Sequence, residues 1–262
     1  MSASLDPLRV LQVTDPHLFA KGDATFRGLA TYESLSQVLE HYRNSGWTAD
    51  LVLVTGDLIQ DESRAAYERF CRKLDALRLP VHCVPGNHDV RPMMMEVLAG
   101  WSFAYCDNFE HGRWLVAGID SCAEGKAAGT VSPEELDRLG TLLERTLAEH
   151  VLIALHHPPL PVGSRWLDQV GLLNSDEFLR VTAGSGKVRA AVFGHVHQEF
   201  EGQHASMRIL GTPSTCRQFR VHSDEFAVDG NPPAYRRLTL YATGEIETDV
   251  VWLRTPQPST DN

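Results

Sequence analysis

The segment 81–89, VHCVPGNHD, runs from a largely apolar stretch straight into a polar cluster. Val81–Val84 is short and rich in valine, which is typical of a buried strand. The Pro-Gly pair that follows predicts a turn, because proline presets φ and glycine accepts left-handed backbone. A turn needs no histidine followed by aspartate, yet His88 and Asp89 come next. If other strands end in the same way, these polar side chains predict a shared site.

Strand and helix patterns alternate around this segment. Short apolar runs predict strands at residues 8–14 and 50–54. Each run precedes a stretch with apolar residues at i, i+3, i+4 and i+7, which predicts helices over 31–44 and 63–77. This β-α-β-α-β order predicts an α/β fold with parallel strands and helices covering a face of the sheet.

The second half of the chain continues the α/β pattern and ends in an antiparallel edge. Ser132, a proline and Glu135 predict a helix start with a capping box, and Leu147 closes the predicted buried stripe of that helix. Further strands are expected at 113–119, 151–155, 188–193, 207–210, 236–242 and 245–253. Two long connections, 158–173 and 213–234, have the length of functional lids.

Five of the expected strands end in side chains that can bind a metal ion. The clusters are Asp15-x-His17, Gly56-Asp57, Gly86-Asn87-His88-Asp89, His156-His157 and Gly194-His195-x-His197. In an open parallel sheet the carboxyl ends of the strands share one edge, where ligands bind. We therefore expect all five clusters to meet. The glycine that precedes three of the candidate ligands allows a sharp exit from the strand.

The candidate metal ligands among these side chains are two aspartates, one asparagine and at least four histidines, without cysteine. Oxygen and nitrogen ligands without thiolate suit iron, manganese, zinc or cobalt rather than a cysteine-bound structural zinc. Seven ligands exceed the need of one ion, and they suffice for two ions if one carboxylate bridges. A pair of metal ions roughly 3.5–4 Å apart is typical of enzymes that cleave phosphoesters.

The ordered set D-x-H, G-D, G-N-H-D, H and G-H-x-H, within residues 13–197, resembles the calcineurin-like metallophosphoesterase superfamily. Three further stretches, 13–20, 166–169 and 211–216, are similar to the bacterial class III 3′,5′-cyclic AMP phosphodiesterases, and this likeness covers nearly the whole chain. The resemblance implies a four-layer α/β/β/α sandwich of two mixed sheets flanked by helices. It also implies iron or manganese as the usual ions.

The resemblance assigns roles residue by residue. One metal ion would be held by Asp15, His17, Asp57 and His197, and the other by Asp57, Asn87, His156 and His195. The residues that border the substrate phosphate would be His17, Asp57, Asn87, His88 and His197. Asp57 would bridge the metal ions, and His88 would protonate the leaving oxygen. Apart from the resemblance, we expect Asp89, the next residue, to orient the His88 ring without binding metal itself. His157 competes with His156 as a ligand, and the family pattern favours His156.

The function implied is hydrolysis of 3′,5′-cyclic AMP to 5′-AMP by a metal-bridging hydroxide that attacks phosphorus in line with the 3′ oxygen. The alternative within the superfamily is a phosphodiesterase for glycerophosphodiesters or other small diesters. A protein phosphatase is disfavoured because the sequence shows no separate docking domain. A scaffold that had lost catalysis should lack ligands, and all seven are present. Trp166 and Phe219, in the long connections, are candidates for stacking on adenine.

Composition and charge narrow the partners to small molecules. The net charge of −10 over 262 residues makes the chain a poor partner for nucleic-acid polymers or anionic membranes. Five cysteines without a CxxC pair favour free thiols in a reducing compartment, so a cytoplasmic location is expected. We predict neither a signal peptide nor a membrane span. A single metallophosphoesterase domain is expected over residues 1–254, with a flexible tail at 255–262.

Overall fold

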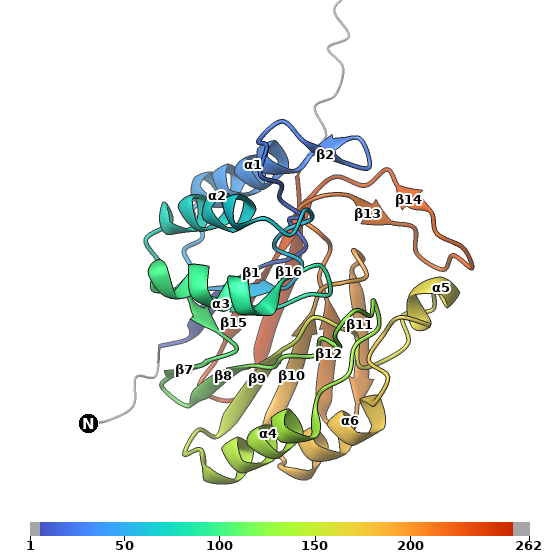
Figure 1. The fold of residues 1–262 in the computed structure, drawn as a ribbon. Helices are drawn as coiled ribbons and strands as arrows, with labels where there is room; N and C mark the ends of the chain where they lie inside the picture. Colours follow the sequence, from blue (N-terminus) through green and yellow to red (C-terminus); the bar gives the residue numbers. More distant parts are fainter. Residues whose placement is uncertain (1–5, 254–262) are drawn as a thin grey trace, which may run out of the picture.

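Two six-stranded sheets lie face to face at the centre of the computed structural model, which describes residues 6–253 (Figure 1). The first sheet contains β1 (Leu8–Val13), β4 (Leu51–Thr55), β5 (Val81–Val84), β6 (Ala104–Tyr105), β15 (Ala234–Leu240) and β16 (Ile246–Trp252). The second contains β7 (Asn108–His111), β8 (Trp114–Gly118), β9 (His150–Ala154), β10 (Val188–Phe193), β11 (Phe200–His204) and β12 (Met207–Gly211). Their strand orders are β16-β15-β1-β4-β5-β6 and β11-β12-β10-β9-β8-β7.

Both sheets are mixed. β1, β4, β5 and β6 are parallel, as are β8, β9, β10 and β12, whereas β15, β16, β7 and β11 pair antiparallel. Helices α1 (Thr31–Asn44), α2 (Arg64–Asp75) and α3 (Arg91–Gly100) flank the first sheet, and α4 (Pro133–Arg145) and α6 (Ser175–Gly184) flank the second (Figure 1). The predicted four-layer α/β/β/α sandwich of mixed sheets is confirmed.

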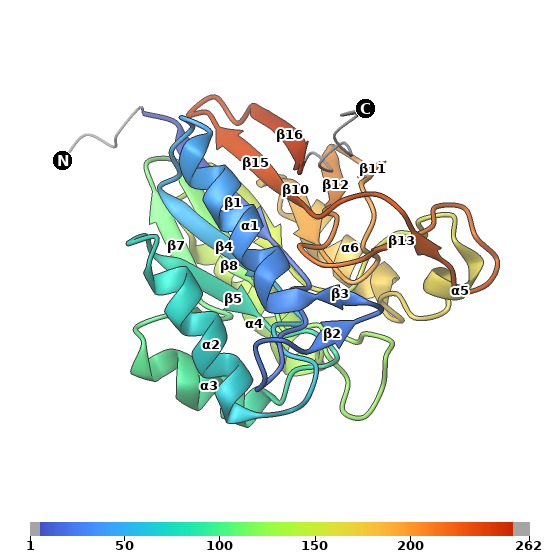
Figure 2. The ribbon, with the colours of Figure 1, turned by 90° about the horizontal axis from the view of Figure 1, so that it is seen from above.

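Three small elements gather at one end of the sandwich. They are the hairpin of β2 (Thr25–Phe26) and β3 (Leu29–Ala30), the pair of β13 (Gln218–Phe219) and β14 (Val228–Asp229), and the short helix α5 (Arg165–Asp168). Figures 1 and 2 both place β2, β13 and α5 on the same side of the two sheets. The two long connections predicted from the sequence supply α5, β13 and β14.

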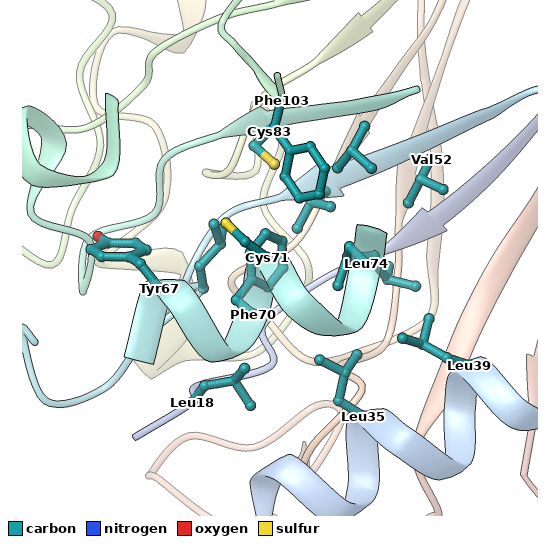
Figure 3. Packing of buried hydrophobic residues seen from close by; sticks show 14 of the residues in the cluster. Leu18, Leu35, Leu39, Val52, Tyr67, Phe70, Cys71, Leu74, Cys83 and Phe103 are labelled. Atoms are coloured by element: carbon teal, nitrogen blue, oxygen red, sulfur yellow. The ribbon is translucent and has the colours of Figure 1, made fainter. Parts of the chain in front are cut away.

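Alternation along the strands builds the layers, because successive side chains point to opposite faces of a sheet. In β4, Val52 packs in the outer cluster under the helices, whereas Leu53 packs between the two sheets. Figure 3 shows Leu39 of α1 and Leu74 of α2 within that outer cluster. Both faces of β4 are buried, which explains its uniformly apolar sequence. Full burial of each leucine stabilises the fold by roughly 1.5–3 kcal/mol.

A buried polar network joins the two sheets beneath their carboxyl ends. Gln12 Nε2 donates to Thr55 Oγ1 at 3.0 Å, and Gln12 Oε1 accepts from Thr212 Oγ1 at 2.7 Å. Arg236 Nε donates to the same Thr212 hydroxyl at 3.0 Å. Gln12 and Arg236 belong to the first sheet and Thr212 follows β12 of the second. The network therefore fixes the two sheets relative to each other close to the strand ends that the candidate ligands follow.

The helix predicted to start at Ser132 is present, with two differences. Ser132 Oγ accepts from the N–H of Glu135 at 3.2 Å, as predicted. The reciprocal contact of a capping box is replaced, because Glu135 Oε1 accepts from the N–H of Asp120 at 3.1 Å. The predicted burial of Leu147 is wrong: α4 ends at Arg145, and Leu147 is 98% exposed.

The domain prediction is not decided by these elements. Both sheets share one buried layer of side chains, which fits the single domain predicted over residues 1–254, but this stays a prediction. The tail predicted at 255–262 lies outside the described residues.

Candidate metal centre

The predicted ligands follow the carboxyl ends of strands from both sheets. Asp15 and His17 follow β1, Asp57 follows β4, Asn87 follows β5, His156 follows β9, and His195 and His197 follow β10. Asn87 is half-buried and the other six are buried. Because the two sheets face each other, the structure brings all seven side chains together.

One group of donors forms around His197. Its Nε2 lies 3.2 Å from Asp15 Oδ1 and 3.1 Å from His17 Nε2. The Nδ1–H of His197 donates to the carbonyl oxygen of Arg217, which leaves the lone pair of Nε2 free. Two ring nitrogens this close share at most one proton, whereas a cation between them would be bound by both.

A second group forms around His156. Its Nε2 lies 3.2 Å from His195 Nδ1, 3.3 Å from Asn87 Oδ1 and 3.5 Å from Asp57 Oδ2. The Nδ1–H of His156 donates to the carbonyl oxygen of Thr55 at 2.8 Å. This bond orients the ring and directs the Nε2 lone pair at the other three donors.

Asp57 lies between the two groups. Its Oδ2 is 3.5 Å from His156 Nε2 and 3.7 Å from His17 Nε2. Its Oδ1 accepts from the N–H of His88 at 2.9 Å, which fixes the plane of the carboxylate. One carboxylate that reaches both groups has the position that a bridging ligand needs.

Without a bound cation, two of the candidate ligand rings are neutral at pH 7 and one is protonated. Burial lowers the pKa of His17 to about 4 and that of His195 to about 3, so both are neutral at pH 7. Burial also lowers the pKa of His156, but the nearby charge of Asp57 outweighs it and raises this pKa to about 9. A cation bound at His156 would therefore displace a proton.

His157 lies beside the second group without offering a free nitrogen. Its Nδ1 is 2.9 Å from Ser121 Oγ, and its Nε2 is 3.1 Å from the carbonyl oxygen of Ala127. Both ring nitrogens thus have protein partners, whereas Nε2 of His156 faces the other donors. The geometry favours His156 over His157 as the ligand.

Five of the seven candidate ligands have left-handed backbone, as do seven other non-glycine residues of the described chain. In the described part of the chain, φ is 51° at Asp15, 46° at His17, 50° at Asp57, 66° at His195 and 50° at His197. A residue with a side chain costs of order 1–3 kcal/mol in such a conformation, and this strain tends to gather at functional sites. One of the hydrogen bonds that stabilise this backbone conformation is donated by the N–H of His195 to Asp15 Oδ2 at 3.0 Å.

The strand exits require glycine for two different reasons. Gly56 has φ of 95°, which other residues rarely adopt. At Gly194 the difficulty is space, because a Cβ there would overlap the hydroxyl of Thr14 and the carboxylate of Asp15. Gly56 therefore allows the sharp turn out of the strand that the sequence predicted. Gly194 is needed because the carboxylate of Asp15, a candidate ligand, lies too close to leave room for a Cβ.

Gly194→Ala is expected to push Asp15 out of place. Overpacking of a tight site typically costs about 1–3 kcal/mol, which lowers Tm by roughly 2–12 °C in a chain of this size. Elemental analysis should find less bound metal, and thermal unfolding should show the lower Tm. The control is Gly184→Ala, where a Cβ has no neighbour within 4 Å. Full metal content and an unchanged Tm in Gly194→Ala would contradict this account.

The orienting role expected of Asp89 is corrected by the structure. Asp89 Oδ2 accepts from the N–H groups of Gly86 at 2.9 Å and Leu58 at 3.2 Å, and Oδ1 accepts from the Tyr67 hydroxyl at 3.0 Å. These bonds tie the turn after β5 to the exit of β4. The carboxylate therefore shapes the loop that carries His88 instead of contacting its ring.

The His88 ring meets the His17 ring edge-on at 5.2 Å, and its hydrogen-bond partner is Gln60. Its Nε2 lies 3.2 Å from His88 Nδ1, and its Oε1 is buried with no hydrogen-bond partner among residues 6–253. An amide can donate through Nε2 to a neutral ring or, after rotation, accept through Oε1 from a protonated one. Gln60 was not predicted from the sequence, although its place three residues after Asp57 in the same loop is a signal.

A pocket of about 290 Å³ opens onto these groups. The polar and charged residues that line it are His17, Arg27, Asp57, Gln60, Asn87, His88, His195 and His197. All five residues predicted to border the phosphate are among them. Nitrogen and oxygen donors thus lie at the bottom of a space that a small ligand can enter.

Residues 8–199 match the family of calcineurin-like phosphoesterases. The chain belongs to the calcineurin-like phosphoesterase family. It is thereby an enzyme of phosphoester hydrolysis. The family uses a dinuclear metal site, and in this calcineurin-like phosphoesterase the donor groups around Asp57 could hold one.

Individual relatives agree with this family. The 3′,5′-cyclic adenosine monophosphate phosphodiesterase CpdA of Vibrio vulnificus is 38% identical over 248 residues, which cover 94% of this calcineurin-like phosphoesterase and 90% of that protein. A 3′,5′-cyclic-nucleotide phosphodiesterase of Nostoc is 36% identical and covers 93% and 92% of the two chains. A dimetal phosphatase from Danio rerio has a TM-score of 0.65 at 19% identity, covers 94% and 99%, and shows the likeness of fold alone.

The helices of this calcineurin-like phosphoesterase are short. The longest between residues 6 and 253 is α1 with 14 residues, and none in that range has the length and apolar character of a membrane span. The cytoplasmic location expected from the cysteines stays a prediction.

Proposed function

We propose that this phosphoesterase hydrolyses 3′,5′-cyclic AMP to 5′-AMP at a two-metal site. The observation that carries the proposal is the convergence of seven donor side chains, with Asp57 between their two groups. Five of them and His88 line one pocket. Support for the substrate comes from relatives 38% and 36% identical, whose names are phosphodiesterases of cyclic AMP and of 3′,5′-cyclic nucleotides.

The donors divide into two proposed ligand sets that share Asp57. The first set is Asp15, His17, Asp57 and His197, and the second is Asp57, Asn87, His156 and His195. Metal ions bound there would supply positive charge for the phosphoryl oxygens and a nucleophilic water near neutral pH. Imidazole and oxygen donors without thiolate support iron or manganese, and the same set accepts zinc or cobalt.

His88 is the proposed proton donor. It lines the pocket beside the ligand sets, and its main-chain N–H donates to Asp57 Oδ1 at 2.9 Å, which ties the His88 backbone to the carboxylate proposed to bridge the metal ions. When the bond between phosphorus and the 3′ oxygen breaks, that oxygen leaves as an alcohol if it receives a proton. Gln60 can partner Nδ1 in both protonation states, so the ring keeps its orientation before and after the transfer.

Gln60→Leu tests this positioning role. The substitution removes one neutral hydrogen bond at roughly constant volume, so kcat for cyclic AMP should fall by about 2–12-fold, the equivalent of about 0.5–1.5 kcal/mol. Because Gln60 acts through His88, KM and metal content should stay within twofold of the wild type. Gln37→Leu, at an exposed position of α1, is the control. A large rise in KM without change in kcat would instead make Gln60 a substrate contact.

A substrate panel tests the function itself. The wild type with its metal content measured by elemental analysis is compared on cyclic AMP, cyclic GMP, 2′,3′-cyclic AMP and a glycerophosphodiester. Highest kcat/KM for cyclic AMP, with 5′-AMP as the product, is the expected result. Preference for the glycerophosphodiester would replace the proposal by its alternative, a phosphodiesterase of other small diesters.

A further inference from the structure

Four aromatic side chains extend the pocket outward from the candidate metal centre. This aromatic wall consists of Phe26, Trp166, Phe219 and Phe226, all of which line the pocket of about 290 Å³. They come from β2, α5, β13 and the loop after β13, segments that are far apart in the sequence but lie at one end of the sandwich (Figure 2). The mechanism proposed above uses none of them.

Two rings of the wall stack on candidate metal ligands. The Phe219 ring stacks on His197 with centroids 4.2 Å apart and 12° between the planes, and Phe26 stacks on His17 at 4.6 Å and 7°. Trp166 meets Phe219 at 5.2 Å in an edge-to-face contact. A molecule whose phosphate lies at the histidines thus has ring surface beside it.

The outer end of the wall is open to a ligand. Phe226 is 46% exposed, although its ring also packs against Trp166 at 5.3 Å and Phe219 at 5.4 Å. The Arg27 guanidinium lies 4.7 Å from the Phe226 centroid and 5.6 Å from that of Phe26, so a cation–π contact spans the mouth of the pocket. An exposed ring at the mouth of a pocket gains stability when a flat apolar group covers it.

The indole nitrogen of Trp166 is the one polar side-chain atom of the wall. Nε1 of Trp166 is buried and has no hydrogen-bond partner in the described part of the chain. An indole N–H can only donate, and a buried donor without an acceptor is uncommon in native proteins. Nε1 is out of reach of a molecule in the pocket, so the wall offers an occupant ring surface and no hydrogen bond of its own.

A second cleft, next to His88, is lined by several carboxylates instead of an aromatic wall, and we call it the acidic cleft. It has a volume of about 760 Å³ and shares Asn87 and His88 with the first pocket. Its lining includes the carboxylates of Glu62, Asp120 and Glu124. Two flat groups also line this acidic cleft, Arg91 and Tyr105, and both are held by Asp120 Oδ2, at 3.3 and 3.1 Å. The acidic cleft thus has one aromatic ring against four in the first pocket, and its carboxylates offer a nucleobase no stacking surface.

We infer that the aromatic wall is the subsite for the purine base of a cyclic nucleotide. The base stacks against Trp166 and Phe226 while its phosphate lies at the histidines, and the acidic cleft stays outside the base contact. This inference rests on the proposed function and adds to it the residues that recognise the base. Stacking uses the face of a ring, so both purines should depend on the wall.

Phe226→Ala is the test, since this partly exposed side chain can be removed with little disturbance of the core. Rates are compared for cyclic AMP, cyclic GMP and a base-free analogue, the methyl glycoside of ribose 3′,5′-cyclic phosphate. Loss of a base-stacking ring typically costs about 5–150-fold, so the ratio of kcat/KM for cyclic AMP to that for the analogue should fall by this factor. Cyclic GMP should lose as much as cyclic AMP.

Two control variants locate the effect. Val221→Ala removes another exposed apolar side chain from the same loop, outside the pocket lining, and should leave the ratio unchanged. Glu124→Ala alters the acidic cleft and should also leave it unchanged. A ratio that falls in Glu124→Ala and not in Phe226→Ala would overturn the inference, as would equal losses for cyclic AMP and the base-free analogue.

A second measurement separates failure of the proposed activity from failure of the base subsite. If the wild type hydrolyses neither cyclic nucleotide, binding of 5′-AMP is measured by calorimetry for the wild type and Phe226→Ala. A rise in Kd of about 5–150-fold in the variant would support the base subsite without the activity. Equal binding to both proteins, or no binding to the wild type, would overturn it.

Discussion

Replacing Asp57 by alanine is expected to empty both proposed metal positions at once. Asp57 Oδ2 lies 3.5 Å from His156 Nε2 and 3.7 Å from His17 Nε2, so its loss removes negative charge from both donor groups. Metal charge stabilises a phosphoryl transition state by several kcal/mol, and about 1.4 kcal/mol is a factor of ten in rate. We therefore expect kcat/KM to fall by roughly three orders of magnitude or more, with metal content near zero.

The measurement is elemental analysis of the purified protein beside kinetics on cyclic AMP. Asp57→Asn is the second variant, because the amide keeps the volume and an acceptor for the His88 N–H while it removes the charge. Circular dichroism shows whether both variants remain folded, and Asp50→Ala, at an exposed residue, is the control. A folded Asp57→Asn protein that retained two metal ions would show that Asp57 is not the bridging ligand.

The fold was predictable where local patterns and burial agree. β4 is short, apolar and buried on both faces, so its sequence alone indicates a parallel strand. Leu147 shows the limit of such patterns. It continues the helical spacing of α4, but Thr146 leaves the helix with ψ of 138°, and the side chain turns to solvent. Periodicity says which residues would share a face and cannot by itself say where the helix ends.

The site was predictable for side chains that follow strand ends, because the topology of parallel strands places them together. The contacts among them were not. Asp89 is adjacent to His88 in the sequence, yet the hydrogen-bond partner of the His88 ring is Gln60, 28 residues away. No sequence pattern indicated that Phe226 lines the pocket. Its position depends on how β13, α5 and the β2–β3 hairpin meet at one end of the sandwich.

His88→Ala is expected to separate catalysis from metal binding. The side chain lines the pocket, but it belongs to neither proposed ligand set, so elemental analysis should still find two metal ions per chain. Loss of an acid catalyst typically lowers the rate by about 10²–10⁴, and we expect kcat for cyclic AMP to fall within this range. His204→Ala, on β11 at the edge of the second sheet, is the control.

The leaving group decides whether this loss reflects proton donation. The 3′ oxygen of a ribose is a strongly basic leaving group and needs a proton, whereas 4-nitrophenolate departs as a stable anion. An acid catalyst therefore accelerates hydrolysis of bis(4-nitrophenyl) phosphate only slightly. In His88→Ala, kcat should fall by less than about tenfold on that ester and by about 10²–10⁴-fold on cyclic AMP. Equal losses on both substrates would mean that His88 binds the phosphate rather than protonating the leaving oxygen, because only a contact with the shared phosphoryl group acts on both esters alike.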